Sequence, residues 1–155
     1  MPIRTRGPLS IHSKVMKRLI LLVALLAVAS CGGDDTPTAP STTSAPYSQT
    51  DLVVGTGAVV ANGNAATISY TGWLHNSARP DNKGTQFDGG VFGPYVVGSG
   101  RVIAGWERGI PGMRVGGQRR LVIPPDLAYG NNSPDPSRIP QNATLVFDVT
   151  LNAVQ

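Results

Sequence analysis

The sequence predicts an α+β fold in which an antiparallel β-sheet wraps around one short α-helix. Short segments with alternating apolar residues recur between turn signals, as is typical of half-buried strands. Only residues 103–110 have the pattern and the boundaries of a helix, with Gly100 before them and Pro111 and Gly112 after them, because proline cannot continue a helix interior. Several strands and one helix together indicate the α+β class.

Four strands are predicted, at residues 51–54, 66–74, 119–123 and 144–151. The last shows the clearest alternation, because apolar side chains stand at every second position and direct one face inward. These side chains are Leu145, Phe147, Val149 and Leu151. A hairpin-type turn is expected at 62–64, and an extended loop over 75–85.

The N-terminal 30 residues are predicted to be a signal peptide. An apolar run at 19–30 follows Lys14, Lys17 and Arg18, and it is too short to be a permanent membrane span, which needs about 20 apolar residues. Both Met1 and Met16 remain open as the start of this signal.

Cys31 follows the apolar run directly, and Val28-Ala29-Ser30-Cys31 resembles a bacterial lipobox. We expect Cys31 to be the lipidated first residue of the mature protein, the alternative being a chance free thiol. The lipid would anchor the protein in the bacterial cell envelope, facing the periplasm. Gly32, rather than an aspartate, follows the cysteine, which favours the outer membrane.

Residues 31–46 are predicted to be the lipidated cysteine and a disordered linker. No large apolar side chain occurs at 32–46, so this segment cannot offset its chain entropy by burial. The folded domain is therefore expected at 47–155, long enough for one modest core.

The positive net charge of the whole chain comes from the predicted signal peptide. The formal net charge is +4 and the sequence pI is about 9.6. Five of the 13 basic residues precede Cys31 and all 9 acidic residues follow it, so the mature protein carries a formal charge of −1. This argues against nucleic acid as a partner. A single cysteine also excludes an intrachain disulfide.

Five motifs follow one another in the predicted domain: ISYTGWL at 68–74, QFD at 86–88, VIAGWE at 102–107, MRVGGQRRLVIPPDLAYG at 113–130 and ATLVFDVTL at 143–151. In order and spacing they resemble the FKBP-type peptidyl-prolyl cis-trans isomerases, from about Tyr47 to the C-terminus. The resemblance implies an FKBP-like sheet around a short helix, a cleft between them, and isomerisation of X-Pro bonds in exported polypeptides. It also implies macrolide ligands, a monomer, and no cofactor or metal.

The chemistry that this family performs breaks no bond. Amide resonance creates a rotational barrier of about 18–20 kcal/mol. An apolar pocket disfavours the more polar planar amide, and fixed hydrogen-bond donors stabilise the twisted one. Aromatic and aliphatic walls with one or two polar groups are therefore sufficient.

The resemblance assigns catalytic positions to Asp88, Tyr129 and Tyr70. Substrate-binding positions are Phe87, Val102, Ile103, Trp106, Ile139, Phe147 and Phe92. It implies that Trp106 forms the floor under the proline ring, and that the Tyr129 hydroxyl and the Ile103 backbone N–H are donors. Asp88 would lie near the rotating amide, held by Tyr70. Taken singly, each aromatic residue would more often be ordinary core, and it is the set in order that favours a pocket.

One segment departs from the family pattern, and another is expected to flank the cleft. Residues 89–100 are shorter than in typical members, and Gly93 stands where a pocket aromatic is expected, so one wall is expected to be open unless Phe92 fills it. Residues 131–141, which contain three prolines, are expected to be a stiff flap over the cleft.

Three alternatives to an isomerase remain. The groove could bind proline-containing segments as a non-catalytic chaperone module tethered to the envelope, or the chain could be an envelope scaffold. A hydrolase is disfavoured because Ser99 and Ser133 have no evident base partner, and His12 and His75 lie far apart in the sequence.

Overall fold

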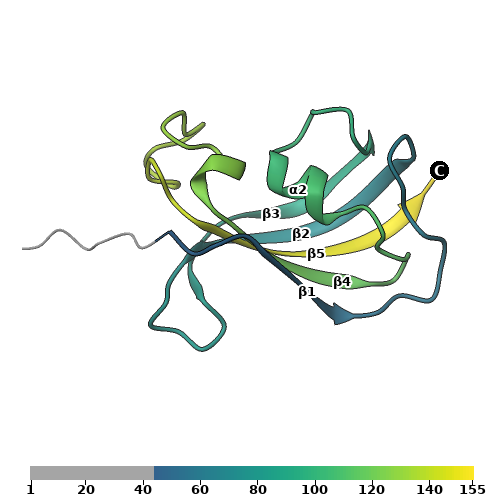
Figure 1. The fold of residues 1–155 in the computed structure, drawn as a ribbon, viewed down its shortest axis with the longest axis horizontal. Helices are drawn as coiled ribbons and strands as arrows, with labels where there is room; N and C mark the ends of the chain where they lie inside the picture. Colours follow the sequence, from purple (N-terminus) through teal and green to yellow (C-terminus); the bar gives the residue numbers. More distant parts are fainter. Residues whose placement is uncertain (1–43) are drawn as a thin grey trace, which may run out of the picture. The chain divides into compact units, whose positions relative to one another are not determined.

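A five-stranded antiparallel sheet carries the fold, with its strands in the spatial order β1-β4-β5-β2-β3 (Figure 1). The computed structural model describes residues 44–155. The predicted signal peptide, Cys31 and most of the predicted linker lie outside these residues. The strands are β1 (Ser48–Val53), β2 (Ala65–His75), β3 (Lys83–Val96), β4 (Gln118–Ile123) and β5 (Leu145–Val154).

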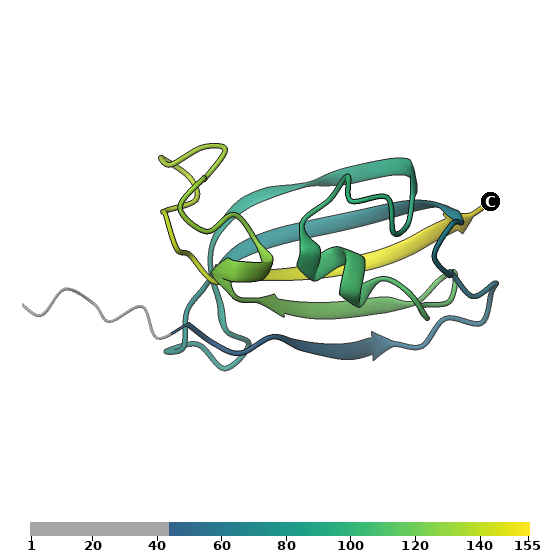
Figure 2. The same ribbon diagram turned by 45° about the horizontal axis from the view of Figure 1, so that its top comes forward.

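The single predicted helix is confirmed as α2 (Ala104–Gly109), and a short 3-10 helix, η1 (Pro125–Leu127), follows β4. Ile103 and Ile110 are the capping residues of α2, so the predicted range is correct to within one residue at each end. The helix covers one face of the sheet, and the ribbon of α2 crosses in front of β4 and β5 in Figure 2.

The third strand corrects the predicted loop over 75–85. β2 extends to His75 and β3 already begins at Lys83, which leaves a loop of only 76–82. β3 has little intrinsic strand preference, because it contains four glycines and Pro94. It is an edge strand, and Pro94 lies where its register with β2 shifts, a position at which a strand tolerates proline.

The hydrophobic core lies between α2 and the inner face of the sheet. The predicted alternation in β5 is confirmed, because Leu145, Phe147, Val149 and Leu151 all belong to the buried core. From β2 the core receives Ala66 and Ile68, and from α2 it receives Trp106. The inner face of the sheet is thus the one on which a cavity can form.

Two glycines allow α2 to lie directly on β4. A Cβ atom on Gly105 would collide with Ile123, and one on Gly109 would collide with Leu121. Both partners are fully buried residues of β4. The absence of two side chains, one helical turn apart, therefore fixes how closely the helix approaches the sheet.

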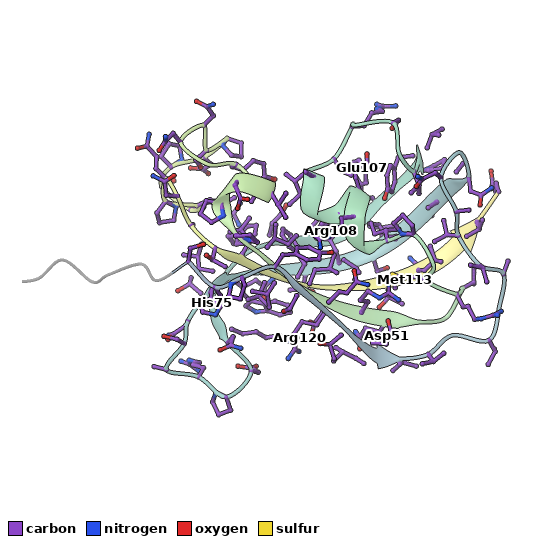
Figure 3. The ribbon with its side chains drawn as sticks, viewed as in Figure 1. Asp51, His75, Glu107, Arg108, Met113 and Arg120 are labelled. Atoms are coloured by element: carbon purple, nitrogen blue, oxygen red, sulfur yellow. The ribbon has the colours of Figure 1, made fainter. Side chains whose placement is uncertain are left out.

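The outer face of the sheet carries charged residues. Asp148, opposite Arg120 in the register of β4 and β5, accepts hydrogen bonds from its guanidinium at 2.7 and 2.9 Å and from Lys83 Nζ at 2.6 Å. Lys83 Nζ also lies 3.9 Å from the centre of the Trp73 ring. Figure 3 places Arg120 on the opposite side of the sheet from Glu107 of α2.

Within residues 44–155, no helix is long and apolar enough to cross a membrane.

Candidate functional site

A cavity of about 380 Å³ lies beside α2 on the inner face of the sheet. Strands β2, β3 and β5, the segment before α2, α2 itself and the loop after η1 all contribute to it. The lining residues are Tyr70, Phe87, Asp88, Phe92, Arg101, Val102, Ile103, Trp106, Tyr129 and Phe147. Segments far apart in the sequence therefore meet at one apolar site.

Aromatic rings form most of the wall. The Trp106 ring centre lies 5.2 Å from that of Tyr70 and 5.3 Å from that of Phe147, both edge to face. Phe87 meets Phe147 at 5.5 Å with the rings perpendicular. Trp106 is only 5% exposed, so the surrounding rings hold its indole in one orientation. Edge-to-face pairs of this kind are worth about 0.5–1.5 kcal/mol beyond their area, which makes the wall rigid.

Tyr70 and Asp88 form a polar pair at the cavity. The Tyr70 hydroxyl donates to Asp88 Oδ2 at 2.8 Å, and the backbone N–H of Gly89 donates to Asp88 Oδ1 at 2.8 Å. Burial, followed by the hydrogen bond with Asp88, raises the pKa of Tyr70 to about 12. Tyr70 is thus a neutral donor, and both carboxylate oxygens of Asp88 are held by the chain.

Three neutral groups at the cavity are donors with no partner within residues 44–155: the Tyr129 hydroxyl, the backbone N–H of Ile103 and the buried indole N–H of Trp106. Burial, and then the charge of Asp88, raises the pKa of Tyr129, so this hydroxyl keeps its proton at neutral pH. The Ile103 N–H belongs to the residue that caps α2, where backbone N–H groups lack an intrahelical acceptor. The Tyr129 hydroxyl and the Ile103 N–H are available to a bound carbonyl.

Glu107 fixes the segment that leads into the cavity. Its carboxylate accepts the backbone N–H of Gly98 at 2.6 Å and that of Gly100 at 2.8 Å. Figure 3 shows Glu107 beside α2, on the side of the turn that precedes the helix. This clamp holds the chain just before the cavity residues 101–103.

Nine of the ten predicted catalytic and substrate-binding residues line the cavity. Ile139 is the exception: it is buried at 7% exposure, and its carbonyl accepts a 2.6 Å hydrogen bond from Ser133 Oγ. This hydrogen bond is local to the loop and does not place Ile139 in the cavity wall. None of residues 131–141 lines the cavity, so the predicted flap contributes nothing to the wall.

At Gly93 the structure has the second of the two expected arrangements, in which Phe92 fills the wall. Gly93 has a φ of 118° and lies where the β2–β3 register shifts, and a Cβ atom there would collide with the carbonyl oxygen of Ala66. It does not line the cavity. Phe92 does, with its ring centre 6.3 Å from that of Trp106 and 5.4 Å from that of Tyr95. Phe92 therefore closes the wall that the sequence left open.

Arg101 is the cavity residue to which the sequence assigned no role. Its only signal was its position directly before the VIAGWE motif at 102–107. No three His, Cys, Asp or Glu side chains in the part of the chain that the structure describes are placed to hold a metal ion.

Comparisons with known proteins agree with this geometry. The family model for "FKBP-type peptidyl-prolyl cis-trans isomerase" matches residues 57–152, more than half of the chain. FK506-binding protein 4 of Dictyostelium discoideum is 46% identical over 103 residues, which are 65% of this chain and 26% of that protein. FK506-binding protein 1B of Neurospora crassa is 41% identical over 106 residues, covering 66% of this chain and 93% of that protein.

A solved structure shares the fold. The peptidyl-prolyl cis-trans isomerase of Pseudomonas syringae pv. tomato is 33% identical, with a TM-score of 0.56, and the match covers 70% of this chain and 75% of that one. The chain spans only about a quarter of the Dictyostelium relative. The family match, the sequence identities and the cavity lead to one conclusion: the chain belongs to the FKBP-type peptidyl-prolyl cis-trans isomerase family.

Proposed function

We propose that the domain catalyses cis-trans isomerisation of X-Pro bonds in polypeptides, with the proline ring seated on Trp106. The observation that carries this proposal is the combination of an aromatic cavity with neutral donors, among them the Tyr129 hydroxyl and the Ile103 N–H, that have no partner within residues 44–155. Membership of the family supports the same reaction.

The catalytic effect follows from the walls and the donors together. In the planar amide the nitrogen lone pair is delocalised into the carbonyl, which makes the group polar and restricts rotation. The apolar rings around Trp106 solvate this form poorly. As the bond twists, the nitrogen becomes pyramidal and the charge separation falls, so the twisted amide loses less in the cavity than the planar one.

The donors then act on the twisted geometry. The Tyr129 hydroxyl and the Ile103 N–H hold carbonyls that flank the proline, and fixed donors cost no reorganisation during the rotation. A hydrogen bond contributes about 0.5–1.5 kcal/mol, and each 1.36 kcal/mol changes the rate about tenfold. Asp88, held by Tyr70, adds a fixed negative charge near the rotating bond. No group has to transfer a proton.

The test is an isomerase assay of the purified chain on a blocked X-Pro peptide. NMR exchange spectroscopy should show cis-trans interconversion faster than the uncatalysed rate, which corresponds to tens to hundreds of seconds. Peptide binding without acceleration would instead make the domain a proline-segment binding module. The absence of both would refute the proposal.

We further propose that FK506, the macrolide named in the relatives, binds in this cavity. The support is the continuous aromatic wall of Trp106, Phe92, Phe87 and Phe147. FK506 should inhibit the assay competitively with the peptide, and Phe92→Ala should weaken inhibition by about 1–3 kcal/mol, the usual worth of a buried apolar side chain. Inhibition that is unchanged in Phe92→Ala would remove Phe92 from the ligand site.

We also propose that the protein is a bacterial lipoprotein that assists the folding of exported proteins from the cell envelope, preferably the outer membrane. The support is the sequence before the described residues: a basic segment, an apolar run at 19–30 and Cys31 in a lipobox-like context. Cells that express the chain should incorporate labelled palmitate, and Cys31→Ser should abolish this labelling. Label in the Cys31→Ser protein would contradict the anchor.

A further inference from the structure

Arg101 is a cavity residue that the isomerase mechanism does not use. It lines the cavity directly before Val102 and Ile103, and its side chain is exposed at the rim. Its guanidinium makes no hydrogen bond and no ion pair with any residue of 44–155. An unpaired cation therefore borders a site whose walls are mainly aromatic.

The other charged residue of the cavity and the arginines of β4 are satisfied by the chain. Asp88, the second charged residue of the cavity, has one oxygen held by Tyr70 and the other by Gly89. Arg119 pairs with Asp51, and Arg120 pairs with Asp148. Among these groups, Arg101 is the one at the cavity that has its full hydrogen-bonding capacity left for a ligand.

The backbone that carries Arg101 is fixed. Glu107 accepts the N–H groups of Gly98 and Gly100, so the residue immediately before Arg101 is tied to α2. After it, the carbonyl of Ile103 begins the hydrogen bonds of α2 by accepting the N–H of Trp106 at 2.9 Å. The guanidinium is therefore presented from a constant position, as a group that selects ligands requires.

We propose that Arg101 sets substrate specificity, by favouring peptides that carry an Asp or Glu side chain directly before or directly after the isomerised proline. The inference rests on the proposed isomerase function. A guanidinium pairs with a carboxylate through two parallel hydrogen bonds, which a neutral amide side chain cannot match. Exposed ion pairs are modest in strength, which corresponds to a preference of about two- to fivefold.

The experiment compares peptide pairs that differ only in charge. Blocked peptides carry Glu or its isosteric amide Gln, either directly before or directly after the proline, and kcat/KM is measured on the full chain by NMR exchange. In at least one of the two positions, kcat/KM for the Glu peptide should exceed that for the Gln peptide by about two- to fivefold at low salt. The ratio should fall toward one at about 1 M salt, where the Debye length is about 3 Å.

Variants assign the preference to Arg101. The Glu/Gln ratio is taken within each protein, so that a change in overall rate cancels. Arg101→Gln should bring the ratio to one, and Arg101→Glu should reverse it. Arg79→Gln is the matched control, because Arg79 is an exposed arginine of the 76–82 loop that does not line the cavity, and it should keep the wild-type ratio.

The outcomes separate the two proposals. A wild-type ratio of one at both positions, or a preference that survives Arg101→Gln, would overturn the role of Arg101 while the isomerase function stands. If neither peptide is turned over, the isomerase proposal fails. The preference is then measured as the ratio of calorimetric dissociation constants for the same peptides, and equal affinities would overturn the inference as well.

Discussion

The cavity and the outer face of the central sheet use polar groups in opposite ways. On the outer face, Asp148 is flanked by Arg120 and Lys83, and every charge has a partner in the chain. At the cavity, Tyr129 and Ile103 present donors with no acceptor among residues 44–155. An unsatisfied buried polar group costs about 1–3 kcal/mol, so open donors beside an apolar cavity indicate a ligand, whereas closed ion pairs indicate stability.

The pKa shifts follow the same division. Burial alone would raise the pKa of Asp148, but its hydrogen bonds with Arg120 and Lys83 outweigh this and hold the pKa below its usual value of 3.8. For Tyr70 on the inner face, burial and the Asp88 hydrogen bond act in the same direction and raise the pKa. The outer face therefore stabilises a charged form and the inner face stabilises a neutral one.

The largest expected effect comes from the cavity floor. Trp106→Ala should lower the free energy of unfolding by about 3–5 kcal/mol, because it removes a buried ring that three other aromatic rings contact. It should also abolish most isomerase activity. Denaturant unfolding and the NMR exchange assay measure the two effects. A variant with wild-type stability would show that the indole is not packed as described.

The outer ion pairs should matter for stability alone. Asp148→Ala leaves two largely buried cations without a carboxylate partner, since the Lys83 and Arg120 side chains are 17% and 23% exposed. The expected loss is about 2–4 kcal/mol of unfolding free energy, somewhat below that of a fully buried pair. Turnover of a neutral peptide should be unchanged. Asp126→Ala, at an exposed position, is the control and should shift stability by less than about 0.5 kcal/mol.

The Tyr129 hydroxyl at the cavity should show the reverse result. Tyr129→Phe removes a donor that has no partner among the described residues, so the melting temperature should stay within a few degrees of wild type. The value of kcat/KM should fall by about two- to tenfold, as expected for the loss of one hydrogen bond in the transition state. An unchanged kcat/KM would exclude Tyr129 as a donor to the substrate.

The smallest and most gradual effect is the dependence of stability on pH. Tyr70 keeps its proton to about pH 12 in the folded state, whereas an unfolded tyrosine loses it near 10, so stability should decline as pH rises from 10 to 12. Asp148 has a lowered pKa, so its contribution should be lost as pH falls below about 3.8. Tyr70→Phe should reduce only the alkaline decline, and Asp148→Asn only the acid one. Denaturant unfolding measured across the pH range tests both predictions. A change in the acid decline in Tyr70→Phe, or in the alkaline decline in Asp148→Asn, would refute the division between the faces.

The sequence predicted those elements of the fold that a short run of neighbouring residues is enough to specify. The alternation in β5 and the proline after α2 are visible in the sequence, and both elements are confirmed. β3 was partly mistaken for a loop because its glycines and Pro94 disfavour a strand. Its extended conformation depends on pairing with β2, which is a tertiary interaction.

Dependence on tertiary contacts also limits what the sequence predicts about the site. Trp106 and the other aromatic positions lie in motifs, and the structure brings them together in one cavity. Ile139 belongs to the buried core and does not line the cavity, which depends on how its loop packs and could not be derived from the sequence motif. Arg101 was missed because a charged residue after a glycine reads as an ordinary turn, and only the assembled cavity shows what it borders.

The two glycines on the face of α2 that packs against β4 have a consequence for how this cavity could change over evolution. Gly105 and Gly109 face β4 and do not line the cavity, yet they set how closely α2, which carries Trp106, approaches the sheet. A single methyl group at either position would push α2 away from β4 and shift Trp106 relative to the strands that form the rest of the cavity. Mutation at two positions outside the lining can therefore alter the dimensions of the cavity while every lining residue stays the same.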